Sequence, residues 1–250
     1  MKMLRIGTSD DVYGPLEPPQ RSWHIVQERL AEWLGEPVET ILKSAWPNDA
    51  YAHVIERWIE REKPDAVFLG VASYWVSFPS APLALEEARV PLAPMLGRLA
   101  TAASRRPRIA HNGAFRLLRR VALRTTGYRY LFEPDGAARR VEDAIRRITR
   151  HEDIALGVRG PLPLGIPLPP RLAAESRARC REFDRLVQAT CKRLHVPYLQ
   201  AGEDEPPRPH ELQRDLTHVN ERGHARRAEH EFQLMHQAWL ASRGGTPAPR

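Results

Sequence analysis

Short apolar runs alternate with longer amphipathic stretches along this chain. The clearest run, 66–71, is apolar at every position, which is typical of a strand buried on both faces of a parallel sheet. Four similar runs predict further strands at 4–8, 38–45, 154–158 and 196–199. Helical spacing of apolar positions predicts helices over 21–34, 51–63, 172–194 and 221–242. Strands that alternate with helices indicate βαβ units and an α/β fold with a parallel sheet.

The third and fourth predicted strands are about eighty residues apart, more than one crossover helix requires. Three stretches between them have helical character, at 83–103, 114–126 and 139–151. We therefore expect a helical insert, at about 80–150, over the carboxyl edge of the sheet. It would belong to a single domain spanning 1–243, and 244–250 would form a flexible tail.

The positive charge of the chain is concentrated in one segment. The whole sequence has a formal net charge of +7, but 105–150 holds thirteen arginines and four acids, a local charge of +9. Part of it, 114–126, reads as a basic amphipathic helix. A solvated helix face explains this pattern, and an anionic ligand, a membrane surface or nucleic acid are the alternatives. No nucleic-acid-binding motif accompanies the arginines, so nucleic acid is not expected as a partner.

Several features indicate a cytoplasmic protein without a membrane span. No apolar run reaches the roughly 18 residues of a transmembrane helix. The first residues enter a strand pattern without the apolar region of a signal peptide. Cys180 and Cys191 fall in one predicted helix, which separates them by about 16 Å. A disulfide requires Cα atoms within about 7 Å, so both thiols are expected to stay reduced.

Three residues far apart in the sequence have the chemistry of a serine hydrolase. Ser9 follows the first predicted strand, while Asp215 and His218 lie three positions apart before the last predicted helix. Ligands of open α/β sheets bind outside the carboxyl ends of the strands, where these segments are expected to converge. His218 would accept the proton of Ser9, and Asp215 would orient the imidazole. Asn220 and Glu221 suit the beginning of a helix directly behind the pair.

On these residues the sequence resembles the SGNH hydrolases, also called GDSL-like esterases and lipases. Ile6-Gly7-Thr8-Ser9 resembles the first block of that family, 63–70 the strand that leads into its third block, and 215–224 its fifth block. The resemblance covers most of the chain and implies a three-layer α/β/α sandwich with five parallel strands in the order 2-1-3-4-5. It also implies an esterase or acyl transferase that acts on a small-molecule ester through an acyl-enzyme, with no metal or organic cofactor.

Two blocks of the family are altered in this chain. The third block, normally Gly-x-Asn-Asp, reads Gly70-Val71-Ala72-Ser73, and no glycine follows the second predicted strand. Both blocks supply oxyanion donors in the family, so the donors here are expected among the N–H of Ser9 and the side chains of Asn48, Ser73 and Asn112. The loss of one such donor typically costs about 10²–10³-fold in rate. A non-catalytic binding module of the same fold is therefore one alternative function, and a binder of an anionic ligand or nucleic acid through the arginine-rich segment is the other.

Two further groups of residues lie near predicted strand ends. Trp46, Tyr74 and Trp75 are expected either to cover the core or to form an aromatic wall of the substrate pocket. Asp10 and Asp11 directly follow Ser9. Adjacent acids in a loop are expected to be solvated, or to cap a helix, rather than to bind a metal.

Overall fold

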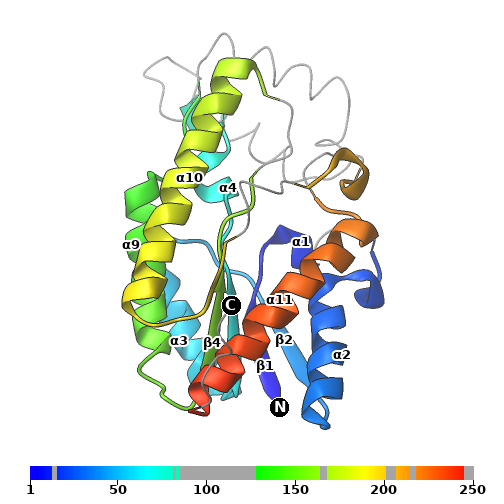
Figure 1. The fold of residues 1–250 in the computed structure, drawn as a ribbon. Coiled ribbons are helices and arrows are strands. Elements are labelled where there is room, and N and C mark those ends of the chain that lie inside the picture. Colours follow the sequence, from blue (N-terminus) through cyan, green and yellow to red (C-terminus); the bar gives the residue numbers. More distant parts are fainter. Residues whose placement is uncertain are drawn as a thin grey trace.

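The computed structural model describes residues 1–12, 16–80, 83–84, 128–163, 168–200, 207–213 and 218–244. They form a three-layer sandwich in which one sheet lies between two layers of helices (Figure 1). The strands are β1 (Lys2–Ile6), β2 (Glu39–Lys43), β3 (Ala66–Gly70), β4 (Ala155–Arg159) and β5 (Tyr198–Leu199). The long helices are α2 (Ser22–Leu34), α3 (Tyr51–Glu62), α9 (Pro134–Ile148), α10 (Pro170–Arg193) and α11 (Glu221–Ser242).

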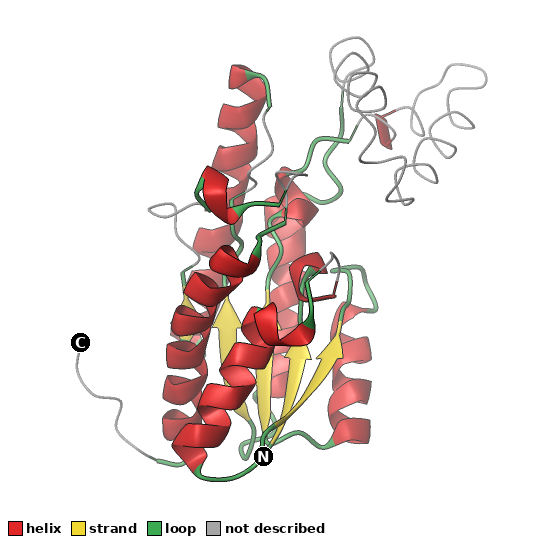
Figure 2. Cartoon of the chain, turned by 90° about the vertical axis from the view of Figure 1, so that its right-hand side faces the viewer, coloured by secondary structure: helices red, strands yellow, loops and turns green. Residues whose placement is uncertain are grey.

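The sheet has the topology that the family resemblance implied. All five strands are parallel, in the order β2-β1-β3-β4-β5. Figure 2 shows the arrowheads of the strands gathered at one edge of the sheet. The central strand β3 pairs with β1 and β4, and all five of its residues are buried. Each strand begins and ends within two residues of its prediction, so the predicted sheet is confirmed.

Different helices cover the two faces of this sheet. Helices α3, α9 and α10 pack on one face, and α2 and α11 pack on the other (Figure 1). The first face has an apolar layer that includes Ile145 of α9 and Phe183 of α10. The second includes Leu30 of α2 and Met235 of α11. Helix α11 approaches β4 so closely that a Cβ on Gly157 would lie 2.8 Å from the sulfur of Met235.

Local signals in the sequence set the ends of several helices. Helix α2 stops at Gly35, whose φ of 70° is left-handed and whose N–H donates to the carbonyl of Ala31. Helix α3 stops in the same way at Lys63, with a φ of 48°. Helix α9 begins with Pro134, at a position where a missing N–H breaks no helical hydrogen bond. Gly35 and Pro134 suit these positions by residue type, so the end of α2 and the start of α9 follow from the local sequence, whereas the left-handed Lys63 does not.

The last part of the expected insert is instead a helix of the sandwich. Most of the stretch at 139–151 belongs to α9, which packs against α3 and α10 and leads into β4 as the crossover helix. Its sequence explains this location, because Val141, Ile145 and Ile148 share one face and are fully buried. A helix with such a face is placed against the sheet, not over its edge.

The other expected parts of the insert, 83–103 and 114–126, lie outside the described residues apart from 83–84, as does 105–127, the first half of the arginine-rich segment. The two residues that flank positions 81–128 pair with each other, because Ser80 and Arg129 exchange two backbone hydrogen bonds of 2.8 and 3.1 Å. The expected tail beyond Gly244 also lies outside the described residues.

The two cysteines are both buried on α10 and neither forms a disulfide, as predicted. Burial raises the pKa of the Cys191 thiol to about 12, so this group stays protonated at neutral pH. Among the helices described here, none combines the length and the apolar character that a membrane crossing requires.

Candidate active site

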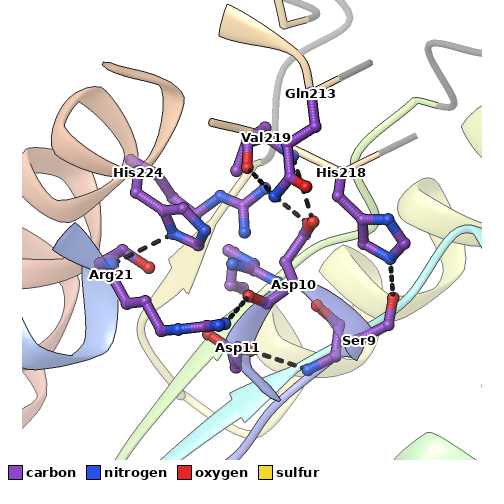
Figure 3. A network of polar contacts seen from close by, with 12 residues as sticks. Ser9, Asp10, Asp11, Arg21, Gln213, His218, Val219 and His224 are labelled. Atoms are coloured by element: carbon purple, nitrogen blue, oxygen red, sulfur yellow. Dashed lines mark hydrogen bonds and ion pairs between the residues drawn. The ribbon is translucent and has the colours of Figure 1, made fainter. Parts of the chain in front are cut away.

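Ser9 lies in a tight turn directly after β1. The N–H of Gly7 extends the sheet by donating to the carbonyl of Lys43 at 2.8 Å, and the four-residue helix α1 (Ser9–Val12) begins two residues later. Gly7 is required here, because a Cβ would lie 2.4 Å from Oδ2 of Asp11. The turn leaves the sheet abruptly and exposes the Ser9 hydroxyl at the carboxyl edge (Figure 3).

His218 meets Ser9 although 209 positions separate them. Its Nε2 lies 3.2 Å from the Oγ of Ser9, within reach for proton transfer (Figure 3). The loop that carries His218 is tied to the preceding segment, because Gln213 N–H donates to the His218 carbonyl at 2.8 Å. The structure thus brings together two of the three predicted residues, and Asp215 lies outside the described residues.

Helix α11 begins directly behind this loop. The Asn220 side chain accepts the N–H groups of Arg222 and Gly223 at 3.0 and 3.2 Å and so caps the helix, as predicted. The Asn220 N–H donates to the carbonyl of Glu211 at 2.8 Å. A Cβ on Gly223 would lie 2.7 Å from that same carbonyl oxygen. The segment from Glu211 to Asn220 carries His218 and is called the histidine loop, and its two ends are therefore held together at the start of α11.

The two acids after Ser9 are ion-paired rather than solvated. Asp11 is fully buried, and its Oδ1 accepts Nε and Nη2 of Arg5 at 3.0 and 2.7 Å. Its Oδ2 accepts the N–H of Thr8 at 2.8 Å, so Asp11 also caps the serine turn. Asp10 pairs with Arg227 of α11 at 2.9 Å. Of the two expected alternatives, solvated acids are wrong because both side chains turn inward, toward arginines of β1 and α11, whereas the capping role is found for Asp11.

Ion pairs continue beneath the turn, between the sheet and α11. Glu231 of α11 pairs with Arg5 of β1 at 2.8 Å and also with Arg159 of β4, and all three side chains are at most 2% exposed. The ring of Phe68 on β3 lies against both guanidinium groups, whose carbons are 4.0 and 5.6 Å from its centroid. We call the following six residues the buried charge network: Arg5, Asp10, Asp11, Arg159, Arg227 and Glu231.

Positive and negative charges balance within this network, which keeps its acids ionised. Burial by itself would raise the pKa of Asp11, but the neighbouring guanidinium groups, Arg5 foremost, hold that pKa well below its usual range. Burial of Glu231 is outweighed in the same way by Arg5 and Arg159, and its pKa is also lowered. The acids that support the serine turn, Asp11 and Glu231, therefore stay ionised at neutral pH.

His224 is a second histidine in this region, and it is neutral at pH 7. Its ring is buried, and its Nδ1 accepts the N–H of Ser22 at 3.1 Å, which joins α11 to the start of α2. Burial, followed by the charge of Arg227, lowers the pKa of His224 to about 4. This histidine links two helices and does not contact Ser9 in the described hydrogen bonds.

Comparison with known proteins identifies the fold. No protein-family model and no curated protein sequence matches the chain. Among solved structures, TesA aligns over 95% of this chain and 99% of its own, with a TM-score of 0.58 and 14% identity. The acetyl xylan esterase AlAXEase aligns over 93% of this chain and 98% of its own, with a TM-score of 0.55 and 13% identity. A catalytic mutant of Axe2, an acetylxylan esterase from Geobacillus stearothermophilus, aligns over 95% of each chain, with a TM-score of 0.54 and 13% identity.

The chain has the SGNH hydrolase fold. The alignments extend over nearly the full length of both partners, so the likeness concerns the whole sandwich and not one half of the sheet. In this SGNH fold, Ser9 and His218 meet at the carboxyl edge of the sheet, where open α/β sheets bind their ligands.

The residues expected to complete an oxyanion hole in this SGNH fold lie in the loops after β2 and β3. Asn48 is exposed, and its Oδ1 accepts the N–H of the residue two positions later, just before α3. Ser73 is buried, and its carbonyl accepts the N–H and the hydroxyl of Ser77 in the short helix α4 (Tyr74–Ser77). Asn112 lies outside the described residues. Which group stabilises an oxyanion stays a prediction.

The aromatic residues at this edge divide between surface and core. Trp46 is 53% exposed, and its ring meets Tyr74 edge-on at a centroid distance of 6.0 Å. Tyr74 in turn stacks on Phe78 at 4.3 Å. Trp75 instead packs in the core, 5% exposed and 6.3 Å from the ring of Phe183. Neighbouring residues of a helical turn point about 100° apart, so Tyr74 and Trp75 cannot both line one wall.

The buried charge network was not predicted from the sequence, although the sequence contains a signal for it. Arg5 interrupts the apolar pattern of β1, and Arg227 and Glu231 occupy the buried face of α11 in line with Met235. Charged residues are rarely buried without a partner. Their place at core positions predicts buried ion pairs, but not which residues pair.

Proposed function

We propose that this protein is a serine hydrolase of carboxylic esters, with Ser9 as the nucleophile and His218 as the general base. The observation that supports it is the 3.2 Å contact between Ser9 Oγ and His218 Nε2 at the carboxyl edge of an SGNH fold. A serine hydroxyl requires such a base, because the neutral hydroxyl is a weak nucleophile. The known proteins with this fold named above include acetylxylan esterases, which is consistent with ester chemistry.

In the proposed reaction, Oγ of Ser9 attacks the ester carbonyl while Nε2 of His218 takes the hydroxyl proton. The tetrahedral intermediate then expels the alcohol, which leaves with that proton, and the acyl group stays on Ser9. Water, deprotonated by His218, attacks the acyl-enzyme; the bond between Oγ and the acyl carbon then breaks, His218 returns the proton to Oγ of Ser9, and the acid is released. An alcohol acceptor in place of water would make the same site an acyl transferase.

Asp215 is the proposed carboxylate that orients His218. Axe2 has been crystallised as catalytic mutants of a serine, an aspartate and a histidine, and that aspartate and histidine are three positions apart. The same spacing separates Asp215 from His218. A carboxylate that accepts the Nδ1 proton of His218 would place the lone pair of the ring on Nε2, which faces Ser9.

The proposed oxyanion donors are the backbone N–H of Ser9 and, from the neighbouring loops, Asn48 and Ser73. The first N–H groups of a helical turn have no acceptor within that turn, and Ser9 is the first residue of α1. Ala72 stands where the family has an asparagine. We therefore expect a rate about 10²–10³-fold below that of an enzyme with the complete set of donors.

Covalent labelling of Ser9 and measurement of ester turnover test this function directly. The wild-type protein is expected to hydrolyse p-nitrophenyl acetate and to gain one phosphonyl group, located on Ser9 by peptide mass spectrometry, after treatment with a fluorophosphonate. Ser9→Ala is expected to lose the label and at least about 10³-fold in turnover. The control is Ser242→Ala, at the far end of α11, whose hydroxyl donates to the carbonyl of Trp239. Unchanged turnover in Ser9→Ala would overturn the assignment.

A non-catalytic binding module is the second candidate, and Ala72 in the third block favours it. This candidate predicts that a fluorophosphonate leaves Ser9 unlabelled in the wild-type protein. It also predicts that an ester ligand raises the melting temperature equally in the wild type and in Ser9→Ala. The hydrolase predicts labelling of the wild type, so the two candidates give opposite results in one experiment.

A further inference from the structure

Asp10 is a carboxylate of the site that the proposed reaction does not use. It directly follows Ser9, and its side chain is only 15% exposed. Its Oδ1 accepts the backbone N–H of Val219 at 3.3 Å, and its Oδ2 accepts Nη2 of Arg227 at 2.9 Å. Figure 3 shows this carboxylate between the serine turn and the loop of Val219 and His218. Asp10 therefore joins the turn of Ser9 to the histidine loop and to α11.

The contacts of Ser9 and Asp10 are two adjacent links between the same two segments. Ser9 Oγ meets the ring of His218, and the next residue, Asp10, binds the N–H of the next residue, Val219. Two neighbouring links restrain rotation as well as distance, because the segments cannot turn past each other without breaking one of them. Such restraint matters for catalysis, since a displacement of about 1 Å can cost about 10²-fold in rate.

The charge of Asp10 also acts on His218. Burial would raise the pKa of Asp10, but Arg227 and then His218 lower it, so the carboxylate is ionised at neutral pH. His218 becomes a cation when it accepts the proton of Ser9, and a nearby carboxylate favours that form while Arg227 disfavours it. Among the residues that the structure describes, the other titratable or charged groups around this pair include Asp11 of α1, Arg21 before α2 and His224 of α11.

We propose that Asp10 is a positioning residue for His218, which holds the histidine loop against Ser9 and favours the protonated imidazole during ester cleavage. This inference rests on the proposed hydrolase function. Asp10 acts through the backbone of Val219 and through its charge, without touching the ester. Arg227 is the partner that holds the carboxylate in place from α11.

Two substitutions of Asp10 separate its hydrogen bond from its charge. Asp10→Asn keeps a side-chain oxygen that can accept the Val219 N–H, whereas Asp10→Ala removes both. We expect kcat for p-nitrophenyl acetate to fall about 10-fold in Asp10→Asn and about 10²-fold in Asp10→Ala, with KM changed less than about threefold. The acid limb of the pH profile of kcat/KM should move to lower pH in Asp10→Asn, because the imidazolium has lost its counter-charge.

A double variant tests whether the effect is electrostatic. In Asp10→Asn, the positive charge of Arg227 acts on His218 without an opposing carboxylate. The second change, Arg227→Gln, removes that positive charge as well. The Asp10→Asn/Arg227→Gln protein is therefore expected to return the acid limb toward its wild-type pH. A purely structural role for Asp10 predicts a lower melting temperature with no movement of the acid limb and no rescue.

NMR titration of the His218 ring makes the test independent of activity. We expect its pKa to be lower by about half a unit to one unit in Asp10→Asn than in the wild type. The control is Glu229→Gln, because Glu229 forms a similar acid–arginine pair from α11 to α2, with Arg29, but on the surface. That variant should leave the titration and the rate unchanged.

The two proposals fail in distinguishable ways. If the wild-type protein neither turns over esters nor labels at Ser9, the hydrolase function is wrong, and the His218 titration still reports on Asp10. If the enzyme is active but His218 titrates at the same pH in Asp10→Asn and kcat is unchanged in Asp10→Ala, the role of Asp10 is wrong and the hydrolase function stands.

Discussion

The two faces of the sheet are built from different interactions. On the face covered by α3, α9 and α10, none of the charged residues of these three helices is buried. On the other face, the buried stripe of α11 is polar near Ser9, with Arg227 and Glu231, and apolar further along, with Leu234 and Met235. Apolar burial has no preferred direction, whereas charge-assisted hydrogen bonds fix both distance and angle. The directional contacts thus lie beneath the candidate catalytic turn.

The buried charge network is a costly way to fill a core. Each buried ion loses several kcal/mol of hydration, and well-packed apolar residues often stabilise a protein as well or better. Within the described part of the chain, Arg5, Arg159 and Arg227 each keep one buried nitrogen without a hydrogen-bond acceptor. The comparison indicates that this face holds the geometry of the serine turn, while the apolar face stabilises the fold.

The largest effect is expected from Glu231→Gln. This change removes almost no volume, but it leaves the buried Arg159 without its described ion pair and Arg5 with Asp11 alone. We expect a loss of about 3–5 kcal/mol in the free energy of unfolding, measured in urea. Ester turnover per folded molecule should fall too, because Arg5 anchors the carboxylate that holds Thr8. A loss below about 1 kcal/mol would contradict the difference between the faces.

A slightly smaller loss is expected from Ile145→Ala on the apolar face. Ile145 is fully buried on α9, and its truncation leaves a cavity that costs about 2–5 kcal/mol of unfolding free energy. Turnover per folded molecule should stay within about twofold of the wild type, because no directional contact of the serine turn is lost. A fall in turnover like that of Glu231→Gln would show that the two faces serve the site equally.

Acid should lower the free energy of unfolding through His224, which lies on the face that holds the buried charge network. An unfolded histidine is protonated below about pH 6.5, but folded His224 has a pKa of about 4 and stays neutral. The unfolded chain therefore binds more protons in this window, and the free energy of unfolding falls by up to about 3 kcal/mol as the pH drops from about 6.5 to 4. Asp11 and Glu231 add a further loss below about pH 4. Their pKa values are lowered in the folded protein, so the unfolded chain binds protons on these groups first.

The variant His224→Asn isolates this contribution, since an amide oxygen can still accept the Ser22 N–H. Urea unfolding at several pH values between 7 and 4 should give a shallower pH dependence for the variant than for the wild type. Parallel curves for the two proteins would contradict a buried neutral His224.

The smallest effect is expected from Glu229→Gln, on the surface of the same helix pair. Glu229 and Arg29 are 53% and 34% exposed, so water and salt screen their attraction. The free energy of unfolding should change by less than about 1 kcal/mol, measured in urea beside Glu231→Gln. A loss comparable to that of Glu231→Gln would show that burial does not govern these pairs.

Much of the fold could be predicted from the sequence. The apolar run of β3, the left-handed stop of α2 at Gly35 and the Asn220 cap of α11 depend on residues close together in the chain, and the structure has each of them. The contact of Ser9 with His218 was also predicted, because the ends of parallel strands meet at one edge. The location of α9 was missed, since its helical pattern does not say whether its apolar face meets the sheet or an insert.

The sequence by itself determined the alternation of strands and helices and the residue types that could perform catalysis. The tertiary structure alone decided that Trp75 enters the core while Trp46 stays exposed, and that Asp10 and Asp11 turn inward to arginines. The physical reason is distance along the chain. Periodicity and capping act over a few residues, whereas Arg5 pairs not only with the nearby Asp11 but also with Glu231, more than two hundred positions away, and only packing brings Arg5 and Glu231 together.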